Sequence, residues 1–271
     1  MWDWLKLRIK KILGMPLPPK PYEQIWEKEG ELFGFYQGNG ELLTGFRFTD
    51  SATMVDVGCG NGGACVFAAT HGANVIGVDI DPVMIELVNK RMREETLSRC
   101  WQTHVSDSNP LPLHSGIATK VICQEVLEHV DDPAIVLSEL VRIGKPGAQY
   151  LLSVPDPVCE SIQREIAPPS YWIKPCHLRV FEREAFGRLV EDSGLTIEMQ
   201  SSYSFFWSMW WILFWADPVK NGPFGGANTP LLRYWNKTWH ALLASQDGSR
   251  IKKALDNFMP KSQVILARKA A

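Results

Sequence analysis

Four glycines in the first quarter of the chain have the spacing of a turn that receives a ligand. The stretch "MVDVGCGNGGACVFAA" (54–69) places Gly58, Gly60, Gly62 and Gly63 between an apolar run and a helix-like run. Glycine permits backbone conformations with positive φ, and it lets a ligand approach main-chain N–H groups at the start of a helix. We therefore expect a nucleotide-type site at this turn.

Three aspartates near the glycines indicate which ligand the turn would take. Asp56 stands two residues before the first glycine, where a carboxylate repels a diphosphate and suits a cationic ligand with an α-amino group. Asp79 ends the next strand-like run, where it can accept hydrogen bonds from both hydroxyls of a ribose. Asp107, in "HVSDSNPLPL", is placed to accept from an adenine amino group. Because D-x-G-x-G-x-G also differs from the GxGxxG of dinucleotide sites, an NAD-dependent oxidoreductase is disfavoured.

Strand-like and helix-like segments alternate from residue 53 onward, which is typical of an α/β fold with a doubly wound, mostly parallel sheet. Strands are predicted at 53–57, 74–79, 101–106, 119–123 and 148–154, with a sixth in "EDSGLTIEMQ" and a seventh in "SQVILARK". Helices are predicted at 63–71, 82–96, 133–143 and 182–193.

Six stretches of the sequence, taken in order, resemble the class I S-adenosylmethionine-dependent methyltransferases, of the kind found among ubiquinone-biosynthesis and related small-molecule methylases. They are "VDVGCGNGG", "VIGVDIDPVMIELV", "SDSNPLPL", "VICQEVLEHVDDP", "LVRIGKPGAQYLLSVP" and "HLRVFEREAFGRLVEDSGL". The resemblance implies a seven-stranded sheet of order 3-2-1-4-5-7-6 with strand 7 antiparallel, and S-adenosyl-L-methionine as the cofactor.

The resemblance also assigns residues of this chain to parts of that cofactor. Asp56, Gly58, Cys59 and Gly60 would line its methionine end, with Gly62 in the same turn; Asp79 and Ile80 would meet the ribose and adenine, Asp107 and Ser108 the adenine, and Gln124 and Glu125 the sulfonium side. Many relatives lay an N-terminal helix over the cofactor, and Tyr22 falls in such a predicted helix.

Two histidines are candidates for a catalytic base, which an acceptor of high pKa such as a phenol needs. His129 in "EVLEHV" follows the fourth strand and His177 in "KPCHLRVF" follows the fifth, where ligands collect in open α/β sheets. The alternative for each is a histidine that braces its loop. Arg179 is expected to pair with a carboxylate of the protein or of the acceptor. No spacing typical of metal ligands is visible, and Asp131 and Asp132 are interpreted as the N-cap of the next helix.

An aromatic stretch, "SYSFFWSMWWILFWADP" (202–218), departs from the minimal members of the family. A helix that is apolar all round must be buried in protein or lipid, and this one is too short to cross a bilayer. Because both ends of the segment 202–261 lie at the edge of the sheet that holds the cofactor, we expect a cap whose wall includes Trp207, Trp210 and Trp211. The alternative is a scaffold helix that only thickens the core. An aromatic wall favours a lipophilic or aromatic acceptor.

The ends of the chain and its composition complete the prediction. "MWDWLKLRIKKIL" is a basic amphipathic segment, so residues 2–13 suit peripheral contact with a membrane or packing on their own domain. The expected domains are 1–20, a helix and proline-rich linker; 21–201 with 262–271, the methyltransferase core; and 202–261, the cap.

A net charge of −2 gives no general attraction to nucleic acid. Six cysteines without a CxxC pair favour reduced thiols and a cytoplasmic protein.

The sequence therefore predicts a methyltransferase that uses S-adenosylmethionine on a small lipophilic or aromatic molecule, with oxygen as the expected acceptor atom. Two alternatives remain open: methylation of a lipid or fatty-acid carboxylate, which needs no base, and a non-catalytic regulatory subunit that binds the cofactor.

Overall fold

The computed structural model describes residues 35–95, 100–217 and 229–271. Its strands are β1 (Phe35–Gln37), β2 (Glu41–Leu43), β3 (Phe46–Arg47), β4 (Thr53–Val57), β5 (Asn74–Asp79), β6 (Trp101–Val105), β7 (Ala118–Gln124), β8 (Gly144–Pro155), β9 (Leu195–Tyr203) and β10 (Ser262–Lys269). Its helices are α3 (Gly63–Thr70), α4 (Pro82–Glu95), α5 (Pro133–Ile143), α6 (Pro157–Ile166), the 3-10 helix η2 (Pro169–Trp172), α7 (Arg183–Asp192), α8 (Phe205–Ala216), α9 (Pro230–Leu243) and α10 (Gly248–Phe258). Residues 2–13 and Tyr22 lie outside the described residues.

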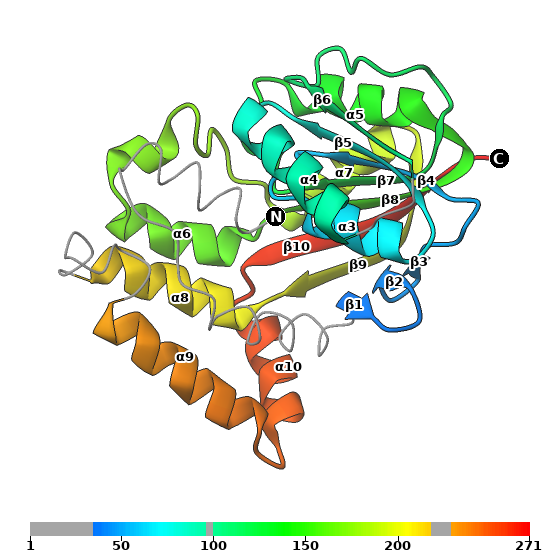
Figure 1. Ribbon diagram of the computed structural model, residues 1–271. Coiled ribbons are helices and arrows are strands. Elements are labelled where there is room, and N and C mark those ends of the chain that lie inside the picture. Colours follow the sequence, from blue (N-terminus) through cyan, green and yellow to red (C-terminus); the bar gives the residue numbers. More distant parts are fainter. Residues whose placement is uncertain (1–34, 96–99, 218–228) are drawn as a thin grey trace.

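The main sheet has seven strands in the order β6-β5-β4-β7-β8-β10-β9 (Figure 1). Strands β6, β5, β4, β7 and β8 pair in parallel, and β10 is antiparallel to both β8 and β9. Counted along the chain from β4, this is the order 3-2-1-4-5-7-6, so the predicted sheet is confirmed. Parallel pairing brings the loops after β4, β5, β6, β7 and β8 to one edge, which is where a site is built in such folds.

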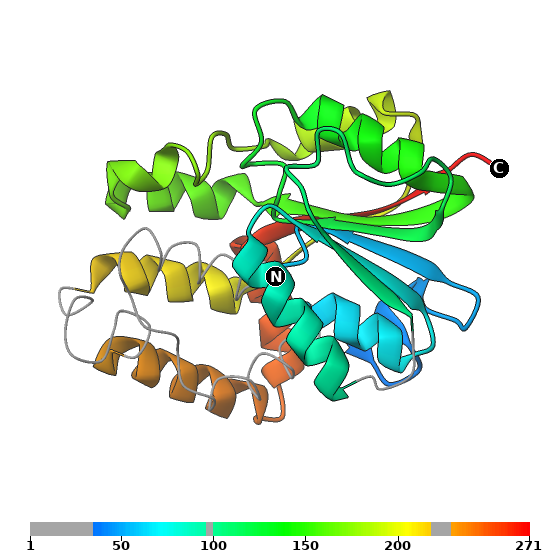
Figure 2. The same ribbon diagram turned by 45° about the horizontal axis from the view of Figure 1, so that its top comes forward.

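Helices cover both faces of this sheet because successive side chains of each strand point to opposite sides. Val55 of β4 belongs to a core that includes Leu137 of α5 and Phe186 of α7. Its neighbour Met54 belongs to a second core with residues of α3 and α4, including Val88. The two helical layers lie on opposite sides of the sheet in Figure 2.

Helix α8 lies in a third core, beside the sheet rather than on it (Figure 1). Its apolar surface is covered by protein on several sides. Trp215 Nε1 donates to Gln163 Oε1 of α6 at 3.0 Å, and Trp235 Nε1 of α9 donates to the Phe206 carbonyl at 3.1 Å. Protein contacts therefore explain why this helix is apolar all round. Among the described residues, no helix combines the length and apolarity that crossing a bilayer demands.

The predicted elements agree with the structure most closely near the site. The bounds predicted for β4, β5 and α5 match, and Asp132 caps α5 by accepting from the main-chain N–H groups of Ala134 and Ile135. The small sheet β1-β2-β3 and the helices α6 and α10 were not predicted. The strands of the small sheet have only three, three and two residues, too few to show an alternating pattern.

Candidate active site

The glycine turn after β4 is packed tightly against other loops of the chain. Gly58 has a φ of +77°, and a Cβ atom added there would lie 2.2 Å from Cγ2 of Val126, in the loop after β7. A Cβ atom on Gly62, whose φ is +80°, would lie 3.0 Å from Cγ2 of Val88 in α4. The glycines therefore bring the turn into contact with the loop that carries His129.

The N–H groups of this turn are bonded inside the protein. Gly58 and Cys59 both donate to the Val78 carbonyl, at 2.8 and 3.0 Å, and Gly60 donates to Asp79 Oδ2 at 2.9 Å. The expectation that a ligand meets main-chain N–H groups is therefore wrong for these three. An anion site needs such donors to be free, so the turn is not built for a diphosphate.

Two buried carboxyl groups give the turn its electrostatic character. Burial raises the pKa of Asp56 from 3.8 to about 6, while the Cys65 thiol, 3.6 Å from its Oδ2, lowers it. Asp79 accepts from the main-chain N–H groups of Gly60 and Asp81, one on each carboxylate oxygen. The pair favours a ligand that brings positive charge and hydroxyl donors.

The residues after β5 and β6 form the outer part of the same edge. Ile80 is 49% exposed and Val83 is 52% exposed, and together they provide an apolar surface for a flat ring. Asp107 is exposed, and its Oδ1 accepts from Asn109 N at 3.1 Å. Ser108 beside it is buried.

Two neighbouring residues at the end of β7, Gln124 and Glu125, differ in their hydrogen-bond partners. Gln124 is buried, and no described residue is hydrogen-bonded to its Nε2. Glu125 accepts from Ser153 Oγ at 3.1 Å and lies 3.4 Å from the Lys261 ammonium. Of the two, Gln124 has the amide group that remains available for a ligand.

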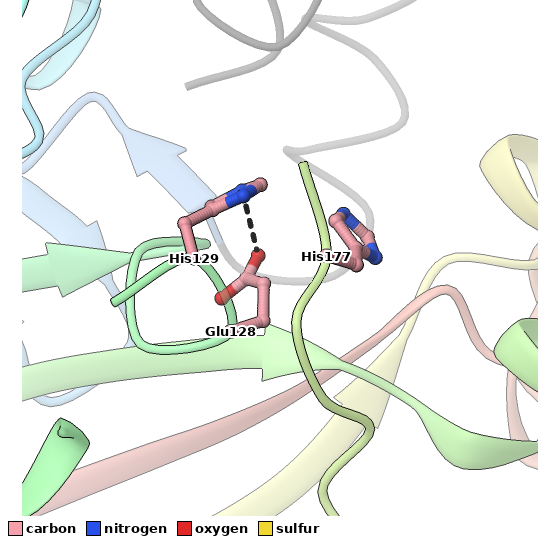
Figure 3. A group of neighbouring side chains, drawn as sticks. All are labelled: Glu128, His129 and His177. Atoms are coloured by element: carbon pink, nitrogen blue, oxygen red, sulfur yellow. Dashed lines mark ion pairs between the residues drawn. The ribbon is translucent and has the colours of Figure 1, made fainter. Parts of the chain in front are cut away.

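His129 and His177 come together although 48 positions separate them in the sequence. Their ring centroids are 5.0 Å apart, and His129 Nε2 lies 3.5 Å from Glu128 Oε1 (Figure 3). All three side chains are buried. Burial raises the pKa of Glu128 well above its ordinary value, and the negative charge of Glu125 raises it further.

Glu128, His129 and His177 together are called the histidine group below. This group has two chemical uses. An imidazole can accept a proton from an acceptor hydroxyl. One ligand atom from each of Glu128, His129 and His177 also lies within 4.8 Å of the others, and two imidazoles with one carboxylate form a donor set for zinc or another divalent transition metal. The sequence analysis expected no metal site, because no local spacing reveals ligands that come from two loops.

His177 has further partners that the sequence analysis did not identify. Its Nδ1 lies 2.7 Å from Glu160 Oε2, and its Nε2 lies 3.3 Å from the Tyr171 hydroxyl. Lys261 lies 3.9 Å from Glu160. Of the partners that the sequence analysis did not identify, Glu128 alone could have been found from its position, because it directly precedes His129.

Arg179 braces the loop that carries the histidine group. Its guanidinium donates to the carbonyl oxygens of Leu127, Val130 and Asp131, at 3.3, 2.5 and 2.7 Å. The expected carboxylate partner is therefore replaced, among the described residues, by main-chain carbonyls.

The three tryptophans predicted to line the acceptor pocket are all buried in the third core. The ring centroids of Trp207 and Trp210 are 5.6 Å apart, and those of Trp210 and Trp211 are 5.0 Å apart. Trp211 also lies 6.5 Å from Tyr171, whose ring is 4.6 Å from that of His177. Through Tyr171, the aromatic core is continuous with the histidine group.

Comparisons with known proteins agree with this fold. A family model described as "Methyltransferase domain" matches residues 55–152. The ubiquinone biosynthesis O-methyltransferase of Thiobacillus denitrificans is 31% identical over 157 residues, which are 53% of this chain and 67% of that protein. The enzyme of the same name from Methylococcus capsulatus is 30% identical over 135 residues, which are 47% of this chain and 55% of that protein.

A solved structure with a related fold is the geranyl diphosphate C-methyltransferase of Streptomyces coelicolor, with a TM-score of 0.57 and 18% identity over 91% of this chain and 81% of that one. The sheet order, the acidic glycine turn and the Thiobacillus relative together define the class of protein. This chain belongs to the class I S-adenosylmethionine-dependent methyltransferases.

Proposed function

We propose that this chain transfers a methyl group from S-adenosyl-L-methionine to an oxygen atom of a small lipophilic or aromatic acceptor. One contact carries the proposal: the close approach of Gly58 to Val126. This contact joins the acidic glycine turn to the loop after β7, in which His129 lies three residues after Val126. The contact supports a cofactor site at the turn that lies beside the buried imidazoles, at one edge of the sheet.

The donor set of the turn fits this cofactor better than a dinucleotide. Asp56 would hold the α-amino group and Asp79 the ribose hydroxyls, while Ile80, Asp107 and Ser108 would border the adenine. When bound, the cofactor supplies a methyl group already activated by the positive sulfur. The protein then has to align the acceptor, exclude water and take up the acceptor's proton.

The histidine group is the proposed site of proton uptake. A phenol with a pKa near ~10 keeps its proton at neutral pH, so its oxygen becomes nucleophilic only beside a base. Methyl transfer from labelled cofactor to a prenylated phenol, to its methyl ether and to a fatty acid tests this. Transfer to the phenol alone supports the proposal. Transfer to the fatty acid alone supports the carboxylate alternative, and binding without any transfer supports a regulatory subunit.

A chelator separates the two uses of the histidine group. If His129 and His177 act as free bases, dialysis against EDTA leaves the rate of phenol methylation unchanged. If Glu128, His129 and His177 hold a divalent cation, the rate falls on dialysis and returns when zinc, manganese or magnesium is added.

The aromatic core supports a lipophilic acceptor. Trp211 contacts Tyr171, and Tyr171 contacts His177, so an acceptor beside the imidazoles would meet apolar ring surface next. We infer that 202–261 forms a cap over this acceptor and that Trp207, Trp210 and Trp211 shape its wall. The names of the two relatives point the same way, since both are ubiquinone biosynthesis O-methyltransferases.

A lipophilic substrate also gives a reason for membrane contact. We propose that residues 2–13 touch a membrane surface peripherally while the catalytic domain stays in the cytoplasm. Flotation with anionic liposomes compares the full chain with a variant lacking residues 1–14. Equal recovery of both in the unbound fraction would contradict this part of the proposal.

A further inference from the structure

Lys261 is the most deeply buried cation among the described residues near the site. It is 0% exposed and stands immediately before β10, where the chain returns from α10 to the sheet. Its Nζ lies 3.4 Å from Glu125 Oε2 and 3.9 Å from Glu160 Oε1. A buried ammonium is tolerated only beside opposite charge, so these three groups must be considered together.

The charges of this group support each other. Burial lowers the pKa of Lys261, but the charges of Glu125 and Glu160 outweigh burial and raise it above its ordinary value. Burial raises the pKa of Glu160, yet the hydrogen bond from His177 and the charge of Lys261 help to hold it below its ordinary value. The geometry therefore places the Lys261 ammonium beside two carboxyl groups, those of Glu125 and Glu160.

The contact with Glu160 determines how His177 carries its proton. A carboxylate only accepts hydrogen bonds, so His177 must donate from Nδ1 across the 2.7 Å contact. The other nitrogen, Nε2, then accepts from the Tyr171 hydroxyl at 3.3 Å. A neutral imidazole in this arrangement keeps Nε2 as its basic atom.

Helix α6 holds Glu160 in place from both ends. Asp156 caps the helix by accepting from Val158 N, pairs with Arg183 at 2.8 Å, and donates its own N–H to the Lys261 carbonyl at 2.8 Å. Further along, Gln163 donates to Glu160 Oε1 at 3.0 Å. Lys261 thus fixes α6 through its main chain and Glu160 through its side chain.

We propose that Glu160 and Lys261 are positioning residues for His177: they hold its ring with Nδ1 protonated and Nε2 presented as the basic atom. This inference rests on the proposed function, because it assigns His177 a part in proton uptake. It adds a link between the acceptor chemistry and the end of the segment 202–261, since Lys261 is the last residue of that segment.

Ring-nitrogen spectroscopy tests the inference without substrate. In the full chain labelled with 15N-histidine, the His177 signals are identified by their loss in His177→Gln. We expect one protonated Nδ1 and one bare Nε2. Glu160→Gln keeps a carbonyl acceptor of nearly the same shape and should keep this pattern. Glu160→Leu removes the acceptor and should give a mixture of both tautomers. An unchanged pattern in folded Glu160→Leu would overturn the inference.

Kinetics provide the second measurement. We expect Glu160→Leu to lower kcat about 100-fold, the cost typical of a misplaced reacting group, with the Kd for S-adenosylhomocysteine unchanged. Glu160→Gln should retain more activity than Glu160→Leu, and an equal loss in both would contradict the positioning role. If the wild type binds the cofactor product but methylates no acceptor, the proposed function fails, while the spectrum still decides the tautomer.

A matched lysine variant tests the part of Lys261. Lys252 in α10 is also buried and paired with a carboxylate, but its partner, Asp256, lies on the same helix. Lys261→Met should shift the Nδ1–H proton of His177 upfield, because the bond to Glu160 loses its support. Lys252→Met should leave that signal in place. Equal spectra for the two variants would remove Lys261 from the proposal.

Discussion

The glycine turn and the histidine group lie at the same edge of the sheet but are held together in different ways. The turn draws on residues 56–63 and on Asp79, and main-chain hydrogen bonds fix it. The histidine group and its supports come from 125–129, 160, 171, 177 and 261, and buried side-chain contacts fix them. One site is local in sequence, whereas the other exists only after the chain has folded.

The two sites also differ in how far the matched family model covers them. The matched family model ends at residue 152, so it includes the turn and His129 but excludes Glu160, His177 and Lys261. Changes in the turn should abolish cofactor binding, and changes in the histidine group should affect chemistry while binding survives.

The largest effect is expected at Gly58. Gly58→Ala places a Cβ atom 2.2 Å from Val126 in a backbone conformation with φ of +77°, so the loop after β7 must move. We expect a loss of about 3 kcal/mol in cofactor binding, or roughly 100-fold in Kd, by calorimetry. Gly116→Ala is the control, because its φ is +65° but nothing lies within 4 Å. Equal losses in both variants would mean that strain alone, and not contact with Val126, explains Gly58.

The histidine group should respond in the rate and not in cofactor binding. His177→Gln and His129→Gln are each expected to slow phenol methylation by about 100-fold or more, since a positioned base contributes that much. The Kd for S-adenosylhomocysteine should stay within about twofold of wild type. His114→Gln, at an exposed position, is the control. Full rates in both site variants would favour the carboxylate acceptor.

Asp56 should give opposite pH dependences for stability and for binding. Its folded pKa of about 6 exceeds 3.8, so the folded protein binds this proton more tightly than the unfolded chain. Acidification from pH 7 to pH 4 should therefore stabilise the free protein by up to about 3 kcal/mol through this group. Cofactor affinity should instead fall as the pH drops through about 6. Asp56→Asn should remove both effects, measured by denaturant unfolding and calorimetry.

A smaller effect is expected where Arg179 braces the loop at 127–131. Arg179→Met leaves three carbonyl groups without their donor and should cost about 1 to 3 kcal/mol of unfolding free energy. Lys174→Met removes an exposed ion pair with Asp131 on the same loop and should cost less than about 1 kcal/mol. If Lys174→Met proves as costly as Arg179→Met, the carbonyl contacts do not brace the loop.

The sequence allowed much of the fold to be predicted because the core strands and α5 carry local signals. Asp132 before Pro133 predicts the start of α5, and apolar runs predict β4 and β5. Helix α10 lacks such a signal, because it buries Lys252 and Asp256 while Phe258 stays 74% exposed. Two charged residues of this helix therefore occupy buried positions and an aromatic residue occupies an exposed one, which an apolar pattern does not predict.

The residues of the candidate site also differ in how well the sequence predicts them. The cofactor residues could be named from one motif and its neighbours, whereas the supports of His177 could not. Glu125 and Lys261 are 136 positions apart, and nothing near either residue indicates its partner. Only the pairing of β10 with β8 brings the lysine to the end of β7.

Calorimetric titration of the full chain with S-adenosylhomocysteine, beside a variant with Asp56, Asp79 and Asp107 all changed to alanine, tests the central claim most directly. The account predicts saturable binding of one molecule per chain to the wild type and none to the folded triple variant. If neither protein gives heat, or if both bind equally, the acidic glycine turn is not the cofactor site and the account is contradicted.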